Sequence, residues 1–340
     1  MPLILRAACA AVLTVCAATA TATATAAARA PASPPPSASQ AEREFAAEVA
    51  REGGPAADAV LQTLAKAKLQ QSILDAIARP AEATKTWAQY RPIFITQKRI
   101  DDGIAFYRDN RELIDRIATQ YGVPAEIIVA IMGVETGYGK ITGKYRVLDA
   151  LVTLAFHYPP REKFFRGELK QLFLLGDAHL AFPIDQLRGS YAGAMGWGQF
   201  MPTSIAKWAR DEDRDGRIDL WASLPDISAS IANYFVEHGW QAGAPVAVRA
   251  QPAADAKPLA DPGIEPIYPL QQMEAWGYAP IERVDAATPS TLLTLEGEQG
   301  REYWLVFGNF RAITRYNKSP LYAMAVFQLA QEIAAGAAAP

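Results

Sequence analysis

The run PAEIIVAIMGVE at residues 124–135 constrains the fold more than any other stretch of this chain. A helix that is apolar on nearly every side has to lie inside a core, so other elements must surround it. The chain has 340 residues, half of them apolar. That is enough for one large core or for two to three packed lobes. We therefore expect a mostly globular protein organised around a buried helix that begins after Pro124.

A single carboxylate closes this run. On a helix, Ile128, Ile131 and Glu135 fall on one stripe, with Met132 beside it. The letters TGYG follow, and their two glycines are expected to end the helix close to the carboxyl. A carboxyl in an apolar wall loses hydration, which raises its pKa. Such a group suits a general acid, for example one that protonates the leaving oxygen of a glycoside.

The alternative for Glu135 is an exposed helix end, or an ion pair with Arg146 or Lys140. The pattern by itself favours this alternative, because most glutamates are solvated. The choice between the two interpretations therefore depends on the other motifs of the chain.

Most of the remaining chain has helical apolar spacing. Residues 41–120 predict helices punctuated by Gly-Gly-Pro and Pro, and residues 97–122 predict one amphipathic helix that ends on Gly122. The final helix has Ser319 as its expected N-cap and Pro320 at its first position. Further helices are predicted from REKFFRGELKQLFLLGDAHL, TSIAKWARDED and DISASIANYFVEHGW.

The helical apolar spacing gives way to short runs of strand-forming residues between residues 243 and 309. APVAVRAQP, EPIYPL, TLLTLEG and REYWLVFGN are short runs with β-branched or aromatic residues, separated by Pro, Gly and Asp. They predict a small antiparallel sheet inserted between helices. The fold class is therefore mainly α (α+β), and no internal repeat is evident.

A glycine-rich loop, GSYAGAMGWGQFMPTS, occupies residues 189–204. Glycines let backbone approach a ligand closely, while aromatic rings and an amide are what a sugar site uses. The alternative is a glycine-rich connection with ordinary core aromatics. A phosphate site is disfavoured, because neither glycine spacing motif occurs and no Lys follows. Four tyrosines could line the same groove or be plain core residues: Tyr90, Tyr234, Tyr316 and Tyr322.

The stretch DEDRDGRIDLW resembles an EF-hand loop flanked by helices. Asp211, Asp213 and Asp215 take loop positions one, three and five, Gly216 takes position six, and Ile218 is the usual apolar eighth residue.

The loop departs from that pattern at position twelve, where Ala222 replaces the bidentate Glu. Asp226 is the next carboxylate and could close a longer loop, with Arg217 giving its carbonyl. We interpret residues 211–226 as a structural calcium site rather than a sensor. Sodium, or an empty solvated loop, is the alternative.

The N-terminus has the composition of a targeting segment. Residues 1–30 have one early basic residue, an apolar stretch and Ala/Thr repeats, which is typical of a secretory signal peptide. Residues 31–40 form a Pro/Ser linker. Both cysteines, Cys9 and Cys16, lie in the segment expected to be removed. We therefore expect a periplasmic protein without disulfides, with lipid anchoring at Cys16 disfavoured by the Val before it.

Charge excludes one class of partner. The formal net charge is −3, and no dense Lys/Arg cluster occurs. We expect no nucleic-acid binding.

Six motifs in one order resemble the type B lytic murein transglycosylases, a lysozyme-like group of peptidoglycan-cleaving enzymes. They are YGVPAEIIVAIMGVETGYG, YPPREKFFRGEL, GSYAGAMGWGQFMPTS, DEDRDGRIDLW, SIANYFVEHGW and RYNKSPLYAMAV. The resemblance runs from about Tyr90 to Ala325. It implies a lysozyme-like helical core with an additional helical domain and a small β insert. In this division residues 41–245 hold the helical domain and core, 246–308 the β insert, and 309–340 the C-terminal core helix.

The resemblance also implies roles for individual residues. Glu135 matches the family's catalytic acid/base, and the family's metal loop is likewise an extended EF-hand, so it implies Asp211, Asp213, Asp215, Arg217 and Asp226 as the ligand set. The positions that match the family's sugar site are Tyr90, Arg161, Ser190, Gln199, Tyr234, Tyr316, Asn317 and Tyr322.

The implied chemistry uses one carboxyl twice and no catalytic cofactor. Glu135 would protonate the oxygen between N-acetylmuramic acid and N-acetylglucosamine, then take the proton of the muramoyl C6 hydroxyl as that oxygen attacks C1. The expected partners are peptidoglycan glycan strands. We expect the protein to be a monomer that could associate peripherally with the wall or membrane. The alternatives are a lysozyme-type muramidase, which normally needs a second carboxylate, and a non-catalytic peptidoglycan-binding protein.

Overall fold

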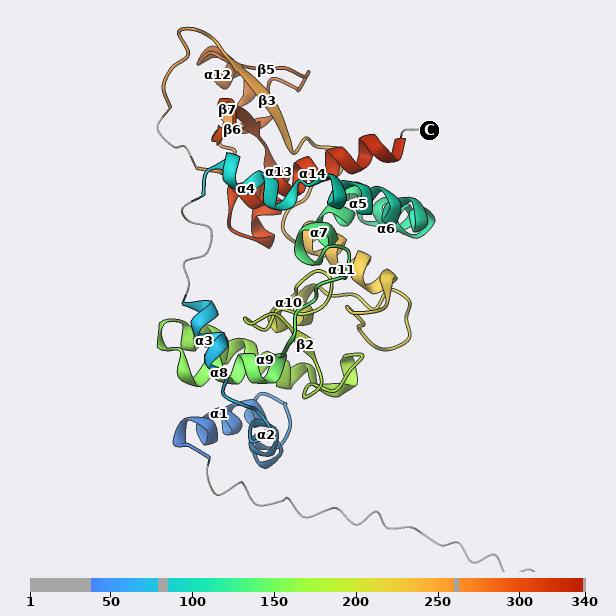
Figure 1. The fold of residues 1–340 in the computed structure, drawn as a ribbon, viewed down its shortest axis with the longest axis vertical. Coiled ribbons are helices and arrows are strands. Elements are labelled where there is room, and N and C mark those ends of the chain that lie inside the picture. Colours follow the sequence, from blue (N-terminus) through green and yellow to red (C-terminus); the bar gives the residue numbers. More distant parts are fainter. Residues whose placement is uncertain (1–37, 79–84, 260–262, 339–340) are drawn as a thin grey trace, which may run out of the picture. The chain divides into compact units, whose positions relative to one another are not determined.

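A computed structural model describes residues 38–78, 85–259 and 263–338 (Figure 1). The predicted signal peptide, its two cysteines and all but the end of the linker lie outside the described residues. Within them the chain is mainly helical with small antiparallel sheets, which confirms the predicted fold class. The helices are α1 (Gln40–Arg51), α2 (Ala57–Leu64), α3 (Gln71–Ile77), α4 (Trp87–Phe94), α5 (Gln97–Asp109), α6 (Arg111–Tyr121), α7 (Ala125–Thr136), α8 (Val147–His157), α9 (Glu162–His179), α10 (Pro202–Trp208), α11 (Leu224–Glu237), α12 (Leu270–Ala275), α13 (Gly308–Tyr316) and α14 (Pro320–Ala338), with a short 3-10 turn at Pro159–Arg161.

Helix α7 is the apolar run predicted to be buried, and the structure confirms it. Ten of its twelve residues are buried, and the two exceptions are Glu126 and Glu135. Helices α5, α6, α11 and α14 all contact it. Each large aliphatic side chain it buries stabilises the fold by about 1.5–3 kcal/mol. The helix therefore holds the carboxyl of Glu135 on a rigid central element.

Helix α7 ends at Gly137, one of the two glycines predicted to end it. Gly137 adopts a left-handed conformation (φ 58°), and its N–H donates to the Gly133 carbonyl. This closes the last turn and satisfies a carbonyl that the helix end would leave without a partner.

The prediction of one continuous helix over residues 97–122 is wrong. The chain leaves helical geometry at Asn110, which separates α5 from α6. The Asn110 side-chain amide donates to the Phe106 carbonyl at 2.8 Å, and this local bond satisfies a helix-end carbonyl in place of a further turn. The predicted end of α6 at Gly122 is confirmed by its left-handed φ of 66°.

The described strands of the insert form one antiparallel sheet in the order β4-β6-β7-β3-β5. Four of them lie in the runs predicted as strands, whereas β5 and α12 were not expected. Their bounds are β3 (Ala247–Pro252), β4 (Tyr268–Pro269), β5 (Tyr278–Pro280), β6 (Pro289–Gly297) and β7 (Gly300–Val306). A separate two-stranded pair joins β1 (Tyr145–Arg146) to β2 (Arg188–Gly189).

The two faces of the β6–β7 hairpin have different neighbours. Leu295, Trp304 and Val306 belong to the large core cluster that the helices build. Leu292 and Leu305, which lie opposite each other on the two strands, belong to a second, smaller cluster with residues of β3 and α12. The sheet is therefore anchored to the helical core through one face only.

No single described helix has both the length and the apolarity to cross a membrane. Only α6 and α7 pass such a test when taken together, as a pair bent by 111°.

Candidate active site

The carboxyl of Glu135 is half-buried in the last turn of α7. The hydroxyl of Tyr322 donates to its Oε1 at 2.5 Å. Lys140 and Arg146, the alternative partners considered from the sequence, bind Asp102 at 2.7 Å and Asp149 at 2.6 Å. The closest polar contact described for Glu135 is therefore a neutral donor on another helix.

Tyr322 owes its position to the start of α14. Ser319 caps this helix as predicted, accepting from the Tyr322 N–H at 3.3 Å. Pro320 follows as the first helical residue, where its fixed φ suits a helix start. Because α14 packs against α7, the first turn of one helix meets the last turn of the other.

Two further tyrosines form an aromatic cluster with Phe200. The rings of Tyr234 and Tyr316 lie 4.7 Å apart, and both contact Phe200 edge-on. Tyr234 donates to the Arg315 carbonyl at 2.6 Å, and Tyr316 donates to the Gly198 carbonyl at 2.7 Å. These bonds fix the orientation of both rings.

Burial keeps these phenols protonated. Loss of hydration, and then the charge of Glu135, raises the pKa of Tyr316 and of Tyr322 well above the ordinary value of 10. Burial raises the pKa of Tyr234 to about 12, although the charge of Arg315 acts in the opposite direction. The Tyr322 hydroxyl is therefore a permanent hydrogen-bond donor to Glu135 in the neutral pH range.

The glycine-rich loop is joined to the end of α7. Thr136, the residue after Glu135, donates through Oγ1 to the Trp197 carbonyl at 3.0 Å and accepts from the Gly139 N–H at 3.0 Å. At Gly139 (φ 78°) a Cβ would lie 2.2 Å from the Trp197 ring, so any other residue there would displace the loop. The loop is therefore held against the helix that carries the acid.

Gln199 has a strained backbone for a non-glycine residue, with φ 51°. Its side-chain amide donates to the Thr142 and Gly196 carbonyls at 3.2 and 3.0 Å. Such strain persists only where surrounding contacts hold it, and it often occurs at functional sites. The amide oxygen keeps its capacity to accept a hydrogen bond from a sugar hydroxyl.

The other predicted sugar-site residues lie in different surroundings. Tyr90 is fully buried, with its ring tilted against Phe94 at 5.0 Å between centroids, whereas Asn317 is exposed directly after α13. The Ser190 hydroxyl accepts from the Ala194 N–H at 3.0 Å, which shapes the glycine-rich loop. Arg161 is exposed, and its guanidinium lies over the Phe164 ring at 4.4 Å. The structure thus brings Tyr322 to Glu135, Tyr316 to the glycine-rich loop and Tyr234 to Tyr316.

Sequence reasoning missed Tyr138. This residue has φ 61° and a buried ring, and its hydroxyl donates to the Arg99 carbonyl at 2.8 Å. The ring fits only because Gly103 and Gly133 leave room for it, since a Cβ at either would lie within 2.6 Å of the hydroxyl. The tyrosine between the two glycines of TGYG was the available signal.

Glu168 was missed as well. It is 4% exposed on α9, and both of its oxygens accept from Thr203, from the N–H at 2.9 Å and from Oγ1 at 2.6 Å. Burial raises its pKa, while the two bonds from Thr203 oppose part of that shift. Glu168 therefore anchors the first turn of α10, which follows the glycine-rich loop.

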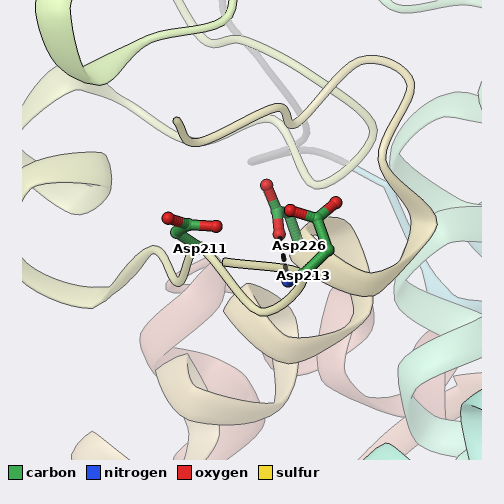
Figure 2. A group of neighbouring side chains, drawn as sticks. All are labelled: Asp211, Asp213 and Asp226. Atoms are coloured by element: carbon green, nitrogen blue, oxygen red, sulfur yellow. Dashed lines mark hydrogen bonds between the residues drawn. The ribbon is translucent and has the colours of Figure 1, made fainter. Parts of the chain in front are cut away.

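The acidic loop brings three predicted ligands together. Asp211, Asp213 and Asp226 each offer a carboxylate oxygen within 4.8 Å of the others (Figure 2). Asp226 is buried in the first turn of α11, and its oxygens accept from the N–H groups of Glu212 at 2.7 Å and Asp219 at 2.9 Å. Burial raises the pKa of Asp226, against these hydrogen bonds, and the charge of Asp213 adds to the rise.

Two predicted metal ligands are placed differently. The Asp215 carboxylate is not in the group of three and accepts from the Arg217 N–H at 2.8 Å. The Arg217 guanidinium donates to the Leu180 carbonyl. Next to them, Gly216 (φ 89°) makes the turn expected at loop position six, and Ile218 pairs with the end of α9 through His179.

The donor set of the acidic loop fits a hard cation. Three close carboxylates repel one another unless a positive charge compensates them, and oxygen ligands are what calcium prefers. Ser223, whose hydroxyl donates to Asp213 at 2.6 Å, is a further oxygen at the edge of the group.

Comparison with known proteins identifies the family. Residues 37–331 match the protein family described as "Transglycosylase SLT domain". The chain belongs to this SLT transglycosylase family. It is 42% identical over 264 residues to the membrane-bound lytic murein transglycosylase B of Escherichia coli K12, an alignment that covers 78% of this chain and 72% of the relative.

Solved structures of SLT transglycosylases share the fold. The soluble lytic transglycosylase SltB1 from Pseudomonas aeruginosa matches 88% of this chain and 100% of its own, with 44% identity and a TM-score of 0.81. The Escherichia coli lytic transglycosylase Slt35 in complex with calcium matches 88% of this chain and 94% of its own, with 38% identity and a TM-score of 0.79.

Proposed function

We propose that this SLT transglycosylase is a lytic transglycosylase that cleaves the β-1,4 bond between N-acetylmuramic acid and N-acetylglucosamine in peptidoglycan. The observation that carries the proposal is the single half-buried carboxyl of Glu135, which ends an otherwise apolar helix and receives the Tyr322 hydroxyl at 2.5 Å. The 42% identity to a lytic murein transglycosylase supports the substrate class.

In the first step Glu135 acts as the acid. Its proton moves to the glycosidic oxygen, the bond from that oxygen to the muramoyl C1 breaks, and N-acetylglucosamine leaves with the proton. The 2-acetamido group of the muramoyl residue can stabilise the positive charge at C1. The Tyr322 hydroxyl then supports the carboxylate that remains, because a hydrogen bond to the charged form favours it.

In the second step Glu135 acts as the base. It takes the proton of the C6 hydroxyl while the C6 oxygen bonds to C1, which gives a 1,6-anhydro sugar and restores the acid. No water enters the product. Glu168 does not supply a second catalytic carboxyl in this account, since Thr203 occupies both of its oxygens.

The aromatic cluster and the glycine-rich loop would hold the sugars. Gln199 offers an amide for hydroxyl groups, the buried Tyr316 holds the loop through the Gly198 carbonyl, and Tyr234 and Tyr316 stay predicted sugar contacts. Tyr90, Ser190, Asn317 and Arg161 stay predicted contacts further along the glycan strand.

The acidic loop would hold a structural calcium ion, with sodium as the weaker candidate. Asp211, Asp213 and Asp226 are the ligands that the geometry supports, and Asp215 and the Arg217 carbonyl remain predictions. Bound calcium would offset the repulsion among these carboxylates and so fix the start of α11. It takes no part in the bond cleavage.

The proposed location is the bacterial periplasm. Peptidoglycan lies outside the cytoplasmic membrane, and the membrane-bound character of the Escherichia coli relative is consistent with the cell envelope.

Mass spectrometry of the products tests the proposed function. Purified peptidoglycan treated with the protein should release fragments with 1,6-anhydro ends. Fragments with a reducing muramic end, heavier by one water, would instead show a lysozyme-type muramidase. Binding without any release would show a non-catalytic peptidoglycan-binding protein.

A further inference from the structure

The acidic loop holds the glycine-rich loop through Trp197. This residue donates its backbone N–H to the Leu220 carbonyl at 2.9 Å and its indole N–H to the Trp221 carbonyl at 3.0 Å. At Gly196 (φ 70°) a Cβ would lie 2.5 Å from Leu220, so the two segments touch with no side chain between them. Two successive carbonyls near the end of the acidic loop therefore fix one residue of the predicted sugar loop.

The segment that carries these two carbonyls is itself held by carboxylates of the acidic loop. The Trp221 N–H donates to Asp219 Oδ1 at 2.8 Å, and the Asp219 N–H donates to Asp226 Oδ2 at 2.9 Å. Asp226 is one of the three carboxylates that the acidic loop brings together. Three successive residue-to-residue hydrogen bonds thus join Asp226 to Trp197, by way of Asp219 and Trp221.

Trp197 also contacts the end of the helix that carries Glu135. Its carbonyl accepts from Thr136 Oγ1 at 3.0 Å, and its ring lies where a Cβ on Gly139 would be. Trp197 therefore connects the acidic loop to the last turn of α7.

The two residues that follow Trp197 belong to the proposed site. The Gly198 carbonyl accepts from the Tyr316 hydroxyl at 2.7 Å, and Gln199 has the strained φ of 51°. Strain of this kind persists only where neighbouring contacts hold it. Because Gln199 lies two residues from Trp197, the bonds that hold Trp197 also restrict where the Gln199 amide can lie.

We propose that Trp197 is a positioning residue that couples the acidic loop to glycan binding. With a cation in the loop, Asp226 stays in place, and the residues bonded to it in sequence, as far as Trp197, stay with it. Without a cation the three carboxylates repel one another, and their displacement reaches the glycine-rich loop through the same bonds. Glycan strands then bind less tightly. This inference rests on the proposed function and on the calcium site proposed with it.

Calorimetric titration of the Glu135→Gln protein, which holds glycan strands without cleaving them, tests this coupling. We expect the strands to bind about fivefold more tightly in calcium than in chelator. By thermodynamic linkage, calcium should bind more tightly by the same factor when strands are present. Adding Trp197→Phe, which keeps a ring but removes the indole N–H, should reduce both factors below about twofold. Trp276→Phe is the matched control, since Trp276 packs in the small cluster of the sheet, and it should keep both factors.

Two further measurements separate positioning from a merely structural role. Trp197→Phe should still melt at a higher temperature in calcium, because it leaves the three carboxylates unchanged. In the protein with Glu135 intact, Trp197→Phe should raise KM for glycan strands about fivefold and leave kcat nearly unchanged, since the bond from Tyr322 to Glu135 is kept.

Equal strand affinity in calcium and in chelator would overturn the coupling while leaving the proposed function in place, and this comparison needs no change at Trp197. Full coupling in Trp197→Phe, or loss of its calcium-dependent rise in melting temperature, would overturn the positioning role. A wild-type protein that releases no anhydro fragments from peptidoglycan would overturn the proposed function, and the positioning role with it.

Discussion

The end of α7 and the acidic loop both depend on carboxyl groups, but their surroundings differ. Glu135 lies at the end of an apolar helix and accepts from a neutral donor, the Tyr322 hydroxyl. Asp211, Asp213 and Asp226 crowd within 4.8 Å of one another in a loop whose N–H groups point at them. A lone carboxyl among apolar neighbours can gain and lose a proton, whereas three crowded carboxylates call for a cation.

The largest expected effect is on catalysis at Glu135. Glu135→Gln keeps the shape and the hydrogen bond to Tyr322 but cannot transfer a proton. We expect release of anhydro fragments to fall by about 1,000-fold or more, with little change in melting temperature. Glu126→Gln, at the opposite end of the same helix, is the control and should keep its activity. A Glu135→Gln variant with near wild-type turnover would contradict the role of Glu135 as the catalytic acid and base.

Tyr322→Phe removes the donor but leaves the acid. A hydrogen bond to a charged group is worth about 1.5–3 kcal/mol, so kcat should fall about 10- to 100-fold. Tyr107→Phe is the matched control, because Tyr107 donates a similar bond to Asp115 at 2.6 Å away from the site. If the two variants lose the same activity, the bond from Tyr322 has no particular role in catalysis.

At the acidic loop we expect calcium to change the stability of the fold. Calcium at 100 times its Kd should stabilise the fold by about 2.7 kcal/mol, a rise in melting temperature of about 5 °C. Asp213→Asn should abolish most of this rise, whereas Asp255→Asn, an exposed acid outside the loop, should retain it. Identical melting curves with calcium and with chelator would contradict a structural ion.

The smallest expected effect is on the pH dependence of stability at Glu168. This carboxyl differs from those of Glu135 and the acidic loop because it is buried and its hydrogen bonds come from Thr203. Because burial raises its pKa above 4.5, the folded protein binds this proton more tightly than the unfolded chain does. Its contribution to the free energy of unfolding is then full below about pH 4.5 and falls as the pH rises through the folded pKa. Wild-type stability should drop relative to Glu168→Gln over that window in denaturant titrations. The exposed control Glu332→Gln should follow the wild type, and parallel curves for all three would contradict a raised pKa.

Local signals predicted much of this molecule. The apolar spacing of residues 124–135 gave the buried helix, Gly137 its end, and Ser319 with Pro320 the start of α14, because each depends on neighbours within one or two turns. Carboxylate spacing predicted the loop at residues 211–226 for the same reason.

Contacts between distant segments could not be predicted from such signals. The bond from Tyr322 to Glu135 joins residues 187 positions apart, and that from Thr136 to Trp197 joins residues 61 apart. Periodicity says which face of a helix is buried but not which residue it meets. The break at Asn110 was missed because both flanking segments keep helical spacing, and the non-helical backbone and side-chain bond of this one residue separate them.

The most direct test of the central claim is cleavage in water labelled with heavy oxygen. If the C6 hydroxyl attacks C1 while Glu135 serves as acid and base, the new muramic ends are anhydro sugars that contain no label. Incorporation of one labelled oxygen at each new muramic end would show that water attacks C1, and would contradict the account.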